Sequence, residues 1–189
     1  DTVSGIIYFA VKPKTIKYKY NTSLGVTVSF ADTTPSPVDI NINSGITDDA
    51  LRSFVIANKL DKNNDGILSE AEIKDITELN LNSVSISSLA DIVKFPYLEV
   101  LRCSGKKLSA IDLTSNIKLK ELDCSDNNIT VLDLSKNTAL TSLTCSHNFL
   151  STLNLSGNTA LTDLDCQNNG LTALDLSNNT ALTSLQCSS

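Results

Sequence analysis

The second half of the chain repeats one pattern of apolar and polar positions every 21 residues. Each copy contains the string Leu-x-x-Leu-x-Cys, and the cysteines of the five copies are Cys103, Cys124, Cys145, Cys166 and Cys187. In an extended segment alternate side chains face opposite sides, so the second leucine and the cysteine point inward while the residue between them points outward. A fixed period of this length with this apolar spacing predicts a solenoid of stacked coils and not a compact enzyme domain.

A shorter echo of the same pattern fills the other half of each coil. One echo runs from Ile129 to Leu134 and is followed by Asn137. Asparagine recurs on both sides of the coil where the chain must turn, and an inward amide can pair with loop backbone groups that would otherwise be buried without partners. We therefore expect these asparagines to be structural. They are Asn116, Asn127, Asn137, Asn148, Asn158, Asn169 and Asn179.

These strings resemble the nested leucine-rich repeats of bacterial surface proteins with internalin-like architecture. The resemblance covers Leu98 to Ser189 and implies an α/β fold, a leucine-rich-repeat solenoid of parallel β coils. The coil before Leu98 is degenerate, because Val84 and the run from Phe95 to Tyr97 stand where asparagine is expected. Atypical first repeats are typical of the capping units of solenoids. We assign residues 76–189 to the array, as one degenerate, four full and one partial repeat.

Upstream of the array, the twelve residues from Asp61 to Glu72 match an EF-hand calcium loop. Calcium takes six to eight oxygen ligands, and Gly66 supplies the sharp turn that the loop requires. The expected ligands are the side chains of Asp61, Asn63 and Asp65, the carbonyl of Ile67, a water-mediated contact from Ser69 and the bidentate carboxylate of Glu72. The alternative is a metal-free Asp/Asn-rich turn between two helices.

The flanks of this loop predict a helix-loop-helix cap over residues 43–75. Thr47 before two aspartates is typical of a helix N-cap, and apolar residues from Leu51 to Leu60 recur at helical spacing. A short exit helix is expected from Ser69 to Asp75. The loop resembles EF-hand and dockerin-type loops, yet the chain has one loop where dockerins usually carry two. A single loop favours a stabilised cap over a sensor, since sensors work through paired hands.

Residues 1–42 form a third part, a β-rich N-terminal segment and linker. Its alternating runs cover residues 6–11, 15–20 and 24–30. The chain contains no methionine, so Asp1 is not a translation start and we expect an upstream leader or domain to have been removed. At the other end the last coil has no polar cap. This predicts exposed Leu182, Leu185 and Cys187, and either a longer array or end-to-end self-association.

The cysteine column invites disulfide, metal and nucleophile interpretations. Neighbouring coils stack about 4.8 Å apart, whereas a disulfide requires Cβ atoms about 3.8 Å apart. The odd number of cysteines and their wide spacing in the sequence also disfavour a disulfide framework and a zinc site. We therefore expect free cysteines packed in the core. The single histidine, His147, occupies a loop position and is expected to be solvated. Without a histidine beside a nucleophile, the sequence predicts a chain that is not an enzyme.

The net charge of the chain and the length of its apolar runs exclude some classes of binding partner. The net charge of −6 and pI near 4.7 argue against nucleic acid and anionic membranes as partners, and no apolar run is long enough to span a membrane. The outward residue between leucine and cysteine varies from coil to coil, as expected of a partner-binding face. It is Arg102, Asp123, Thr144, Asp165 and Gln186 in successive coils. On the opposite side the equivalent residue is nearly uniform. It is Asp112, Asp133, Asn154 and Asp175.

The sequence therefore predicts a non-catalytic protein-binding or adhesion module of the bacterial cell surface, or of an extracellular protein, with calcium stabilising its cap. Arg102 is the best candidate anchor of a protein ligand, because arginine is enriched among residues that dominate binding energy. One alternative is a passive spacer or stalk whose repeats only set length. A second is an accessory domain of a larger secreted enzyme. A varied outward column favours binding, whereas uniform columns on both sides would favour the spacer.

Overall fold

The computed structural model describes residues 39–188. All of these residues belong to one compact unit. The three alternating runs predicted within residues 6–30 lie outside the described residues, so they stay predictions.

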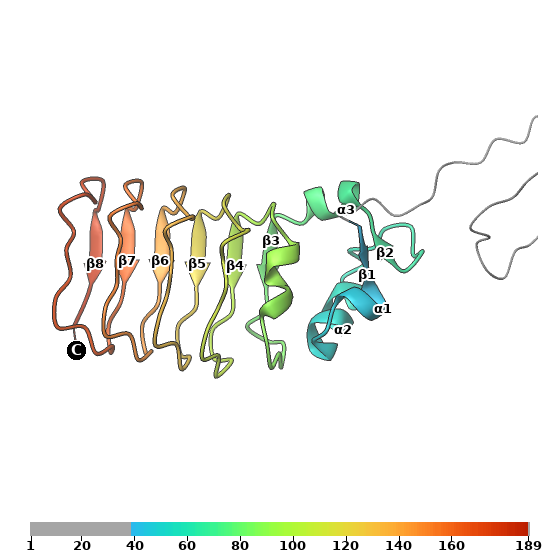
Figure 1. Cartoon of the computed structure of the whole chain (residues 1–189), viewed down its shortest axis with the longest axis horizontal. Coiled ribbons are helices and arrows are strands. Elements are labelled where there is room, and N and C mark those ends of the chain that lie inside the picture. The colour runs from blue at the N-terminus through green and yellow to red at the C-terminus, as the bar shows by residue number, and fades with distance from the viewer. Residues whose placement is uncertain (1–38, 189) are drawn as a thin grey trace, which may run out of the picture. The chain divides into compact units, whose positions relative to one another are not determined.

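The array folds as a solenoid with one continuous parallel sheet along one side (Figure 1). From β4 (Val100–Arg102) onward, successive strands pair one 21-residue repeat apart, so that Leu101 lies beside Leu122 and Leu122 beside Leu143, whereas Leu79 of the degenerate first coil lies 22 residues before its partner Leu101. The strands, in order across the sheet, are β3 (Glu78–Asn80), β4 (Val100–Arg102), β5 (Glu121–Asp123), β6 (Ser142–Thr144), β7 (Asp163–Asp165) and β8 (Ser184–Gln186). The predicted parallel solenoid is confirmed.

Within the described residues, the opposite side of each coil contains no strand, although the sequence carries the same apolar pattern there. Asparagine side chains connect the coils instead. Asn137 donates through Nδ2 to the carbonyls of Leu113 at 3.1 Å and Asn116 at 2.9 Å in the preceding coil. Near the sheet, Asn127 donates to three carbonyls and accepts from two backbone N–H groups. The predicted structural role of these asparagines is confirmed.

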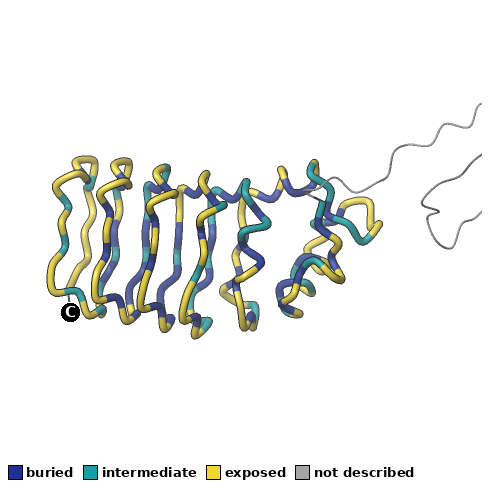
Figure 2. Tube along the Cα trace, in the orientation of Figure 1, coloured by how far each residue is buried: buried dark blue, intermediate teal, exposed yellow. Residues whose placement is uncertain are grey.

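The inward leucines and cysteines form a core that runs along the array, as the buried segments in Figure 2 show. All five cysteines are free, and Cys103, Cys124, Cys145 and Cys166 are buried, as predicted. Burial raises the pKa of the Cys103 thiol to about 12 and that of Cys166 to about 11. Cys187 is exposed, and so is Leu185 at 44%. The exposure predicted for Leu185 and Cys187 in the last coil is thus confirmed, whereas Leu182 is half-buried, and Cys187 does not belong to the buried cysteine column.

The cap lies at the other end of the sheet and contains most of the helices (Figure 1). Helix α2 buries Leu51 and Val55 completely, which confirms the apolar stripe read from the sequence. The elements of the cap are β1 (Ile40–Asn41), α1 (Ile42–Gly45), α2 (Asp49–Ala57), β2 (Ile67–Leu68) and α3 (Glu70–Asp75), while the 3₁₀ helix η1 (Ala90–Lys94) lies between β3 and β4, in the first coil. Strands β1 and β2 pair antiparallel, so the cap includes residues 40–42, which the sequence had grouped with the N-terminal segment.

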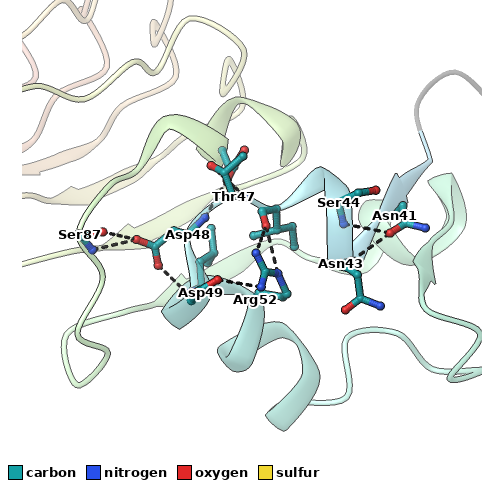
Figure 3. Close-up of polar contacts among 11 residues, drawn as sticks. Asn41, Asn43, Ser44, Thr47, Asp48, Asp49, Arg52 and Ser87 are labelled. Carbon is teal, nitrogen blue, oxygen red and sulfur yellow. Dashed lines mark hydrogen bonds and ion pairs between the residues drawn. The ribbon is translucent and has the colours of Figure 1, made fainter.

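Two carboxylates fasten the cap to the first coil. Asp48 accepts from the Leu51 N–H at 2.9 Å as the N-cap of α2, and its second oxygen accepts from the N–H and hydroxyl of Ser87 (Figure 3). Thr47 was expected to be the N-cap, and that assignment is wrong. Its N–H and hydroxyl both donate to Asp91 in η1, at 2.6 and 2.7 Å. N-cap prediction uses only residues close in sequence, so it could not detect that Thr47 bonds to Asp91, which lies 44 residues away.

Candidate functional site

Two regions carry the site residues expected from the sequence: the loop between α2 and α3, and the outward face of the parallel sheet. The loop has the backbone shape of a calcium loop. Asn64 and Gly66 adopt left-handed conformations, with φ of 57° and 81°. The tight turn therefore falls where the motif places it, since glycine adopts this conformation without a Cβ clash.

Hydrogen bonds within the loop orient its oxygen atoms. Asp61 Oδ2 accepts from the Gly66 N–H at 2.9 Å, Asn63 Oδ1 from the Asp65 N–H at 3.0 Å, and Asp65 Oδ1 from the Ile67 N–H at 2.8 Å. Asp61 is only 7% exposed, and its Oδ1 atom is buried without a hydrogen-bond partner. A buried, unpartnered carboxylate oxygen is costly, and a bound cation would remove that cost.

Glu72 closes the loop from its C-terminal end. Its Oε2 accepts from the N–H and hydroxyl of Ser69, which forms the capping box of α3, and its Oε1 accepts from the Lys62 N–H at 2.8 Å. Burial raises the pKa of Glu72, but these hydrogen bonds and one from the Asn63 backbone outweigh burial and lower it. Glu72 is thus held as a carboxylate at the edge of the loop.

The loop oxygens are not gathered into one tight cluster. Among residues 39–188, no group of three or more His, Cys, Asp or Glu side chains is placed to hold a metal ion together. The three carboxylates of the motif, Asp61, Asp65 and Glu72, are therefore not converged on one point, and the Asn63 amide and the Ile67 carbonyl complete its donor set. The residues fit calcium by donor chemistry, by loop conformation and by the unpartnered oxygen of Asp61.

The second region is the sheet face, defined as the outward side chains of β3 to β8. In each strand the central leucine points inward, and the residues before and after it both point outward. The five residues expected from the sequence do form one in-register column after the leucine, together with Asn80. A second column, before the leucine, was missed: Glu78, Val100, Glu121, Ser142, Asp163 and Ser184. The period of two along a strand would have identified it.

Charge is distributed unevenly along the sheet face. Arg102 forms ion pairs with Glu78 and with Glu121, at 3.0 Å in the latter case, so its charge is compensated within the sheet. Farther along, Asp123, Asp163 and Asp165 form no ion pair with any residue in the described part of the chain. They accept hydrogen bonds from neutral neighbours, as Asp123 does from Ser125 at 2.6 Å.

A shallow depression of about 240 Å³ lies over β6, β7 and β8. Hydroxyl, amide and carboxylate groups line it, including Thr144, Asp163, Asp165 and Gln186. The half of the sheet face away from the cap is therefore polar, acidic and slightly hollowed. A cationic group of a partner would find uncompensated carboxylates there, whereas it would meet Arg102 near the cap.

The back column, defined as Asp112, Asp133, Asn154 and Asp175, is nearly uniform, and it shares one turn contact with Asp123 and Asp165 of the sheet face, which accept from the N–H groups of Ser125 and Gln167. Each side chain accepts a hydrogen bond from the backbone N–H two residues later. Hydrogen bonds from Thr114 lower the pKa of Asp112, and equivalent bonds from serine lower the pKa of Asp133 and of Asp175. The repeated turn accounts for this uniform column.

His147 is exposed in a turn, with φ of 54° and a ring nitrogen 3.1 Å from the Asn168 amide. The expected solvated position is thus confirmed. No helix in residues 39–188 is both long and apolar enough to cross a membrane.

No protein-family model and no curated protein sequence matches this chain. Among solved structures, the chain is similar to the functional domain of InlJ from Listeria monocytogenes, which includes a cysteine ladder. The identity is 32%, the match covers 64% of this chain and 31% of that chain, and the TM-score is 0.54.

The chain is also similar to an internalin, InlF, from Listeria monocytogenes, at 26% identity over 78% of this chain and 45% of that chain, with a TM-score of 0.67. Internalin C2 of the same organism shares the fold, at 16% identity over 82% of this chain and 92% of that chain, with a TM-score of 0.53. The chain spans less than half the length of the InlJ and InlF chains. Its structural neighbours are thus internalin and leucine-rich-repeat proteins.

Proposed function

We propose that this chain is a non-catalytic protein-binding module of the bacterial cell surface, and that the sheet face binds the partner. The uneven charge of this face is the observation that carries the proposal. A passive spacer needs no distinction between its two sides, yet the back column is nearly uniform while the residues of the sheet face change in charge and polarity from strand to strand. The similarity to internalin and leucine-rich-repeat structures supports the same class of function.

The charge distribution also indicates what kind of partner fits. Asp123 and Asp165 are half-buried, in the strands on either side of Thr144, and neither forms an ion pair within residues 39–188, although Arg102 lies beside Asp123 in the sheet register. Complementary charge steers association and selects partners, so a protein segment rich in lysine or arginine is the expected ligand of this end. Arg102 is held between two glutamates, and this fixed guanidinium offers an oriented anchor for a carboxylate or amide of the same partner.

The test compares two sets of substitutions on opposite sides of the solenoid. Asp123→Ala with Asp165→Ala should weaken the affinity for a purified partner by about tenfold or more, which corresponds to about 1.4 kcal/mol. Arg102→Ala should also weaken it. The matched control replaces Asp112 and Asp133 by alanine, which removes two charges from the back column. Binding lost through the control and retained by the first set would assign recognition to the wrong side.

Calcium at the cap is the second part of the proposal. Asp61, Asn63, Asp65 and Glu72 would hold the ion through their side chains, with the Ile67 carbonyl, and Ser69 would contribute through water. The bound ion would supply a positive charge that compensates the carboxylates and partners the buried Asp61 oxygen. The exposed loop would thereby gain a fixed conformation.

Calcium that binds only the folded cap stabilises it by an amount set by mass action. For a dissociation constant near 10⁻⁵ to 10⁻⁴ M, about 1 mM calcium stabilises by roughly 1.4 to 2.7 kcal/mol. A chelator should therefore lower the melting temperature of the full chain, and Glu72→Ala should abolish the difference. Equal melting temperatures with calcium and with chelator, in a chain that retains Glu72, would refute calcium stabilisation and leave the sheet-face proposal untouched.

A further inference from the structure

The loop contacts a part of the chain that is not part of the EF-hand motif. Strand β2, which lies inside the loop, pairs antiparallel with β1, so that Ile40 faces Leu68 and Asn41 faces Ile67. The Ile42 N–H donates to the Gly66 carbonyl at 3.0 Å, immediately before β2. The two-residue strand that enters the cap is thus held by the central residues of the loop.

Side-chain hydrogen bonds and burial in the core also hold residues 39–42 in place. Asp39 Oδ1 accepts from the Glu70 N–H at 2.9 Å, directly after the loop's β2 strand and at the start of α3. Asn41 accepts from two N–H groups of α1, which fixes the exit of the segment (Figure 3). Ile40 and Ile42 are 6% and 3% exposed. Residues 39–42 are therefore held by the loop on one side and by α1 and the core on the other.

The alternation of hydrogen bonds along an antiparallel pair links these contacts to the metal ligands. Because Ile42 bonds with Gly66, the Asn41–Ile67 pair is a non-hydrogen-bonded pair, and the backbone groups of Ile67 point away from β1. Strand β2 therefore has two roles. One edge of it pairs with β1, and its other edge carries the Ile67 carbonyl, which is the expected backbone ligand.

We propose that the loop is a calcium-dependent clamp on residues 39–42. This proposal rests on calcium binding at the loop as proposed above, and it adds a consequence of that binding. An ion that fixes the conformation of Gly66 and Ile67 also fixes the Gly66 carbonyl, which accepts from Ile42, and the edge of β2 with which β1 pairs. Linkage is reciprocal, so pairing of β1 must strengthen calcium binding by the same factor by which calcium strengthens the pairing.

Amide hydrogen exchange of the full chain, read by NMR in calcium chloride and in chelator, tests the clamp. If opening of the clamp destroys the metal site, about 1 mM calcium slows exchange at Ile42 and Glu70 by a factor of about 10 to 100. The loop amides of Gly66 and Ile67 should slow by a similar factor. The amides of Cys124 and Cys145, in the middle of the array, serve as internal controls and should exchange at the same rate in both solutions.

Substitutions of Asp39, which is not a loop ligand, test the reciprocal effect. Asp39→Ala removes the acceptor of the Glu70 N–H and should weaken calcium affinity by at least about threefold in titration calorimetry, through the coupling described above. Asp39→Asn removes the same charge but keeps an acceptor oxygen, and should stay closer to the parent affinity. Asp49→Ala removes one charge from an exposed position of the cap and controls for long-range electrostatics.

The outcomes separate the clamp from calcium binding. Calcium-dependent slowing at Ile42 and Glu70 together with Gly66 supports the clamp. Slowing confined to Gly66 and Ile67, or equal affinities for Asp39→Ala and Asp49→Ala, would overturn the clamp while calcium binding stands. Calorimetry without any binding signal for the parent chain would overturn both.

Discussion

Replacing Asp48 is the sharpest test of how the cap is joined to the solenoid. This carboxylate is 7% exposed and accepts four hydrogen bonds: one from Leu51 in α2, two from Ser87 and one from Ser88, at 2.8 to 3.1 Å. One oxygen caps a helix and the other binds the first coil. Asp48→Ala therefore removes both functions at once.

The expected loss follows from these contacts. Removal of an N-cap acceptor costs about 1 kcal/mol. The donors of Ser87 and Ser88 are part-buried and lose a charged acceptor, at about 1 to 3 kcal/mol. We expect Asp48→Ala to lower the free energy of unfolding by about 3 kcal/mol. Asp48→Asn keeps one acceptor oxygen, which can serve the cap or the coil but not both, and should lose about half as much.

Urea unfolding followed by far-ultraviolet circular dichroism measures this loss, because most helical residues lie in the cap. Asp49→Ala is the control, since its carboxylate side chain is 90% exposed and its ion pair with Arg52 is worth at most about 1 kcal/mol. A loss for Asp48→Ala no larger than for Asp49→Ala would refute the reasoning.

Acid should act on the same junction. Burial raises the pKa of Asp48 and of Asp91, but hydrogen bonds outweigh burial and hold both pKa values below the ordinary value of 3.8. The donors to Asp48 are Leu51, Ser87 and Ser88, and the donors to Asp91 are Lys94 and Thr47. A carboxyl whose folded pKa is depressed contributes stability that is complete above its unfolded pKa and is lost as pH falls through its folded pKa. The junction should therefore weaken only below about pH 4, and less so in Asp48→Ala.

Two further predictions concern the repeats. Cys103, Cys124, Cys145 and Cys166 should resist alkylation in the native chain while Cys187 reacts, as mass spectrometry after labelling would show; rapid native labelling of Cys124 would contradict the buried column. Asn137→Ala removes two buried hydrogen bonds, to the carbonyls of Leu113 and Asn116, and at about 1 kcal/mol each it should lower the free energy of unfolding by about 2 kcal/mol. The exposed Asn154→Ala should change it by less than about 0.5 kcal/mol. Equal urea midpoints for these two variants would contradict the structural role of the inner asparagines.

The period of the sequence predicted those features that depend on stacking identical units. Leu122 and Cys124 are inward because every neighbouring coil places the same residues there, and the parallel register follows from the constant interval of 21 residues. The second side of the coil carries the same pattern without forming a strand, and asparagine amides take over part of the connection between coils. Apolar spacing specifies which side chains are buried, but not which backbone groups pair.

Contacts between segments far apart in the chain could not be predicted in this way. The bond from Thr47 to Asp91 joins positions 44 residues apart, and β1 is too short to show any alternation. The Arg102 pairs are a different case. Glu121 lies two residues before an outward position of the next strand, so the register alone places it beside Arg102. The sequence contained that information, and the single-column interpretation did not use it.

The contrast between inner and outer positions indicates where affinity can be changed without loss of stability. The side chain of an inner residue such as Asn137 donates to the coil before it, while its backbone carbonyl accepts from Asn158 of the coil after it, so replacing the side chain removes the contacts of one interface between coils. Thr144 and Gln186 point outward, next to carboxylates that form no ion pair within the described part of the chain. Because the stacking of the coils does not depend on them, the chain is free to vary them from coil to coil. The outward positions of the sheet face at which the residue differs from coil to coil are therefore the ones that can serve to recognise a partner.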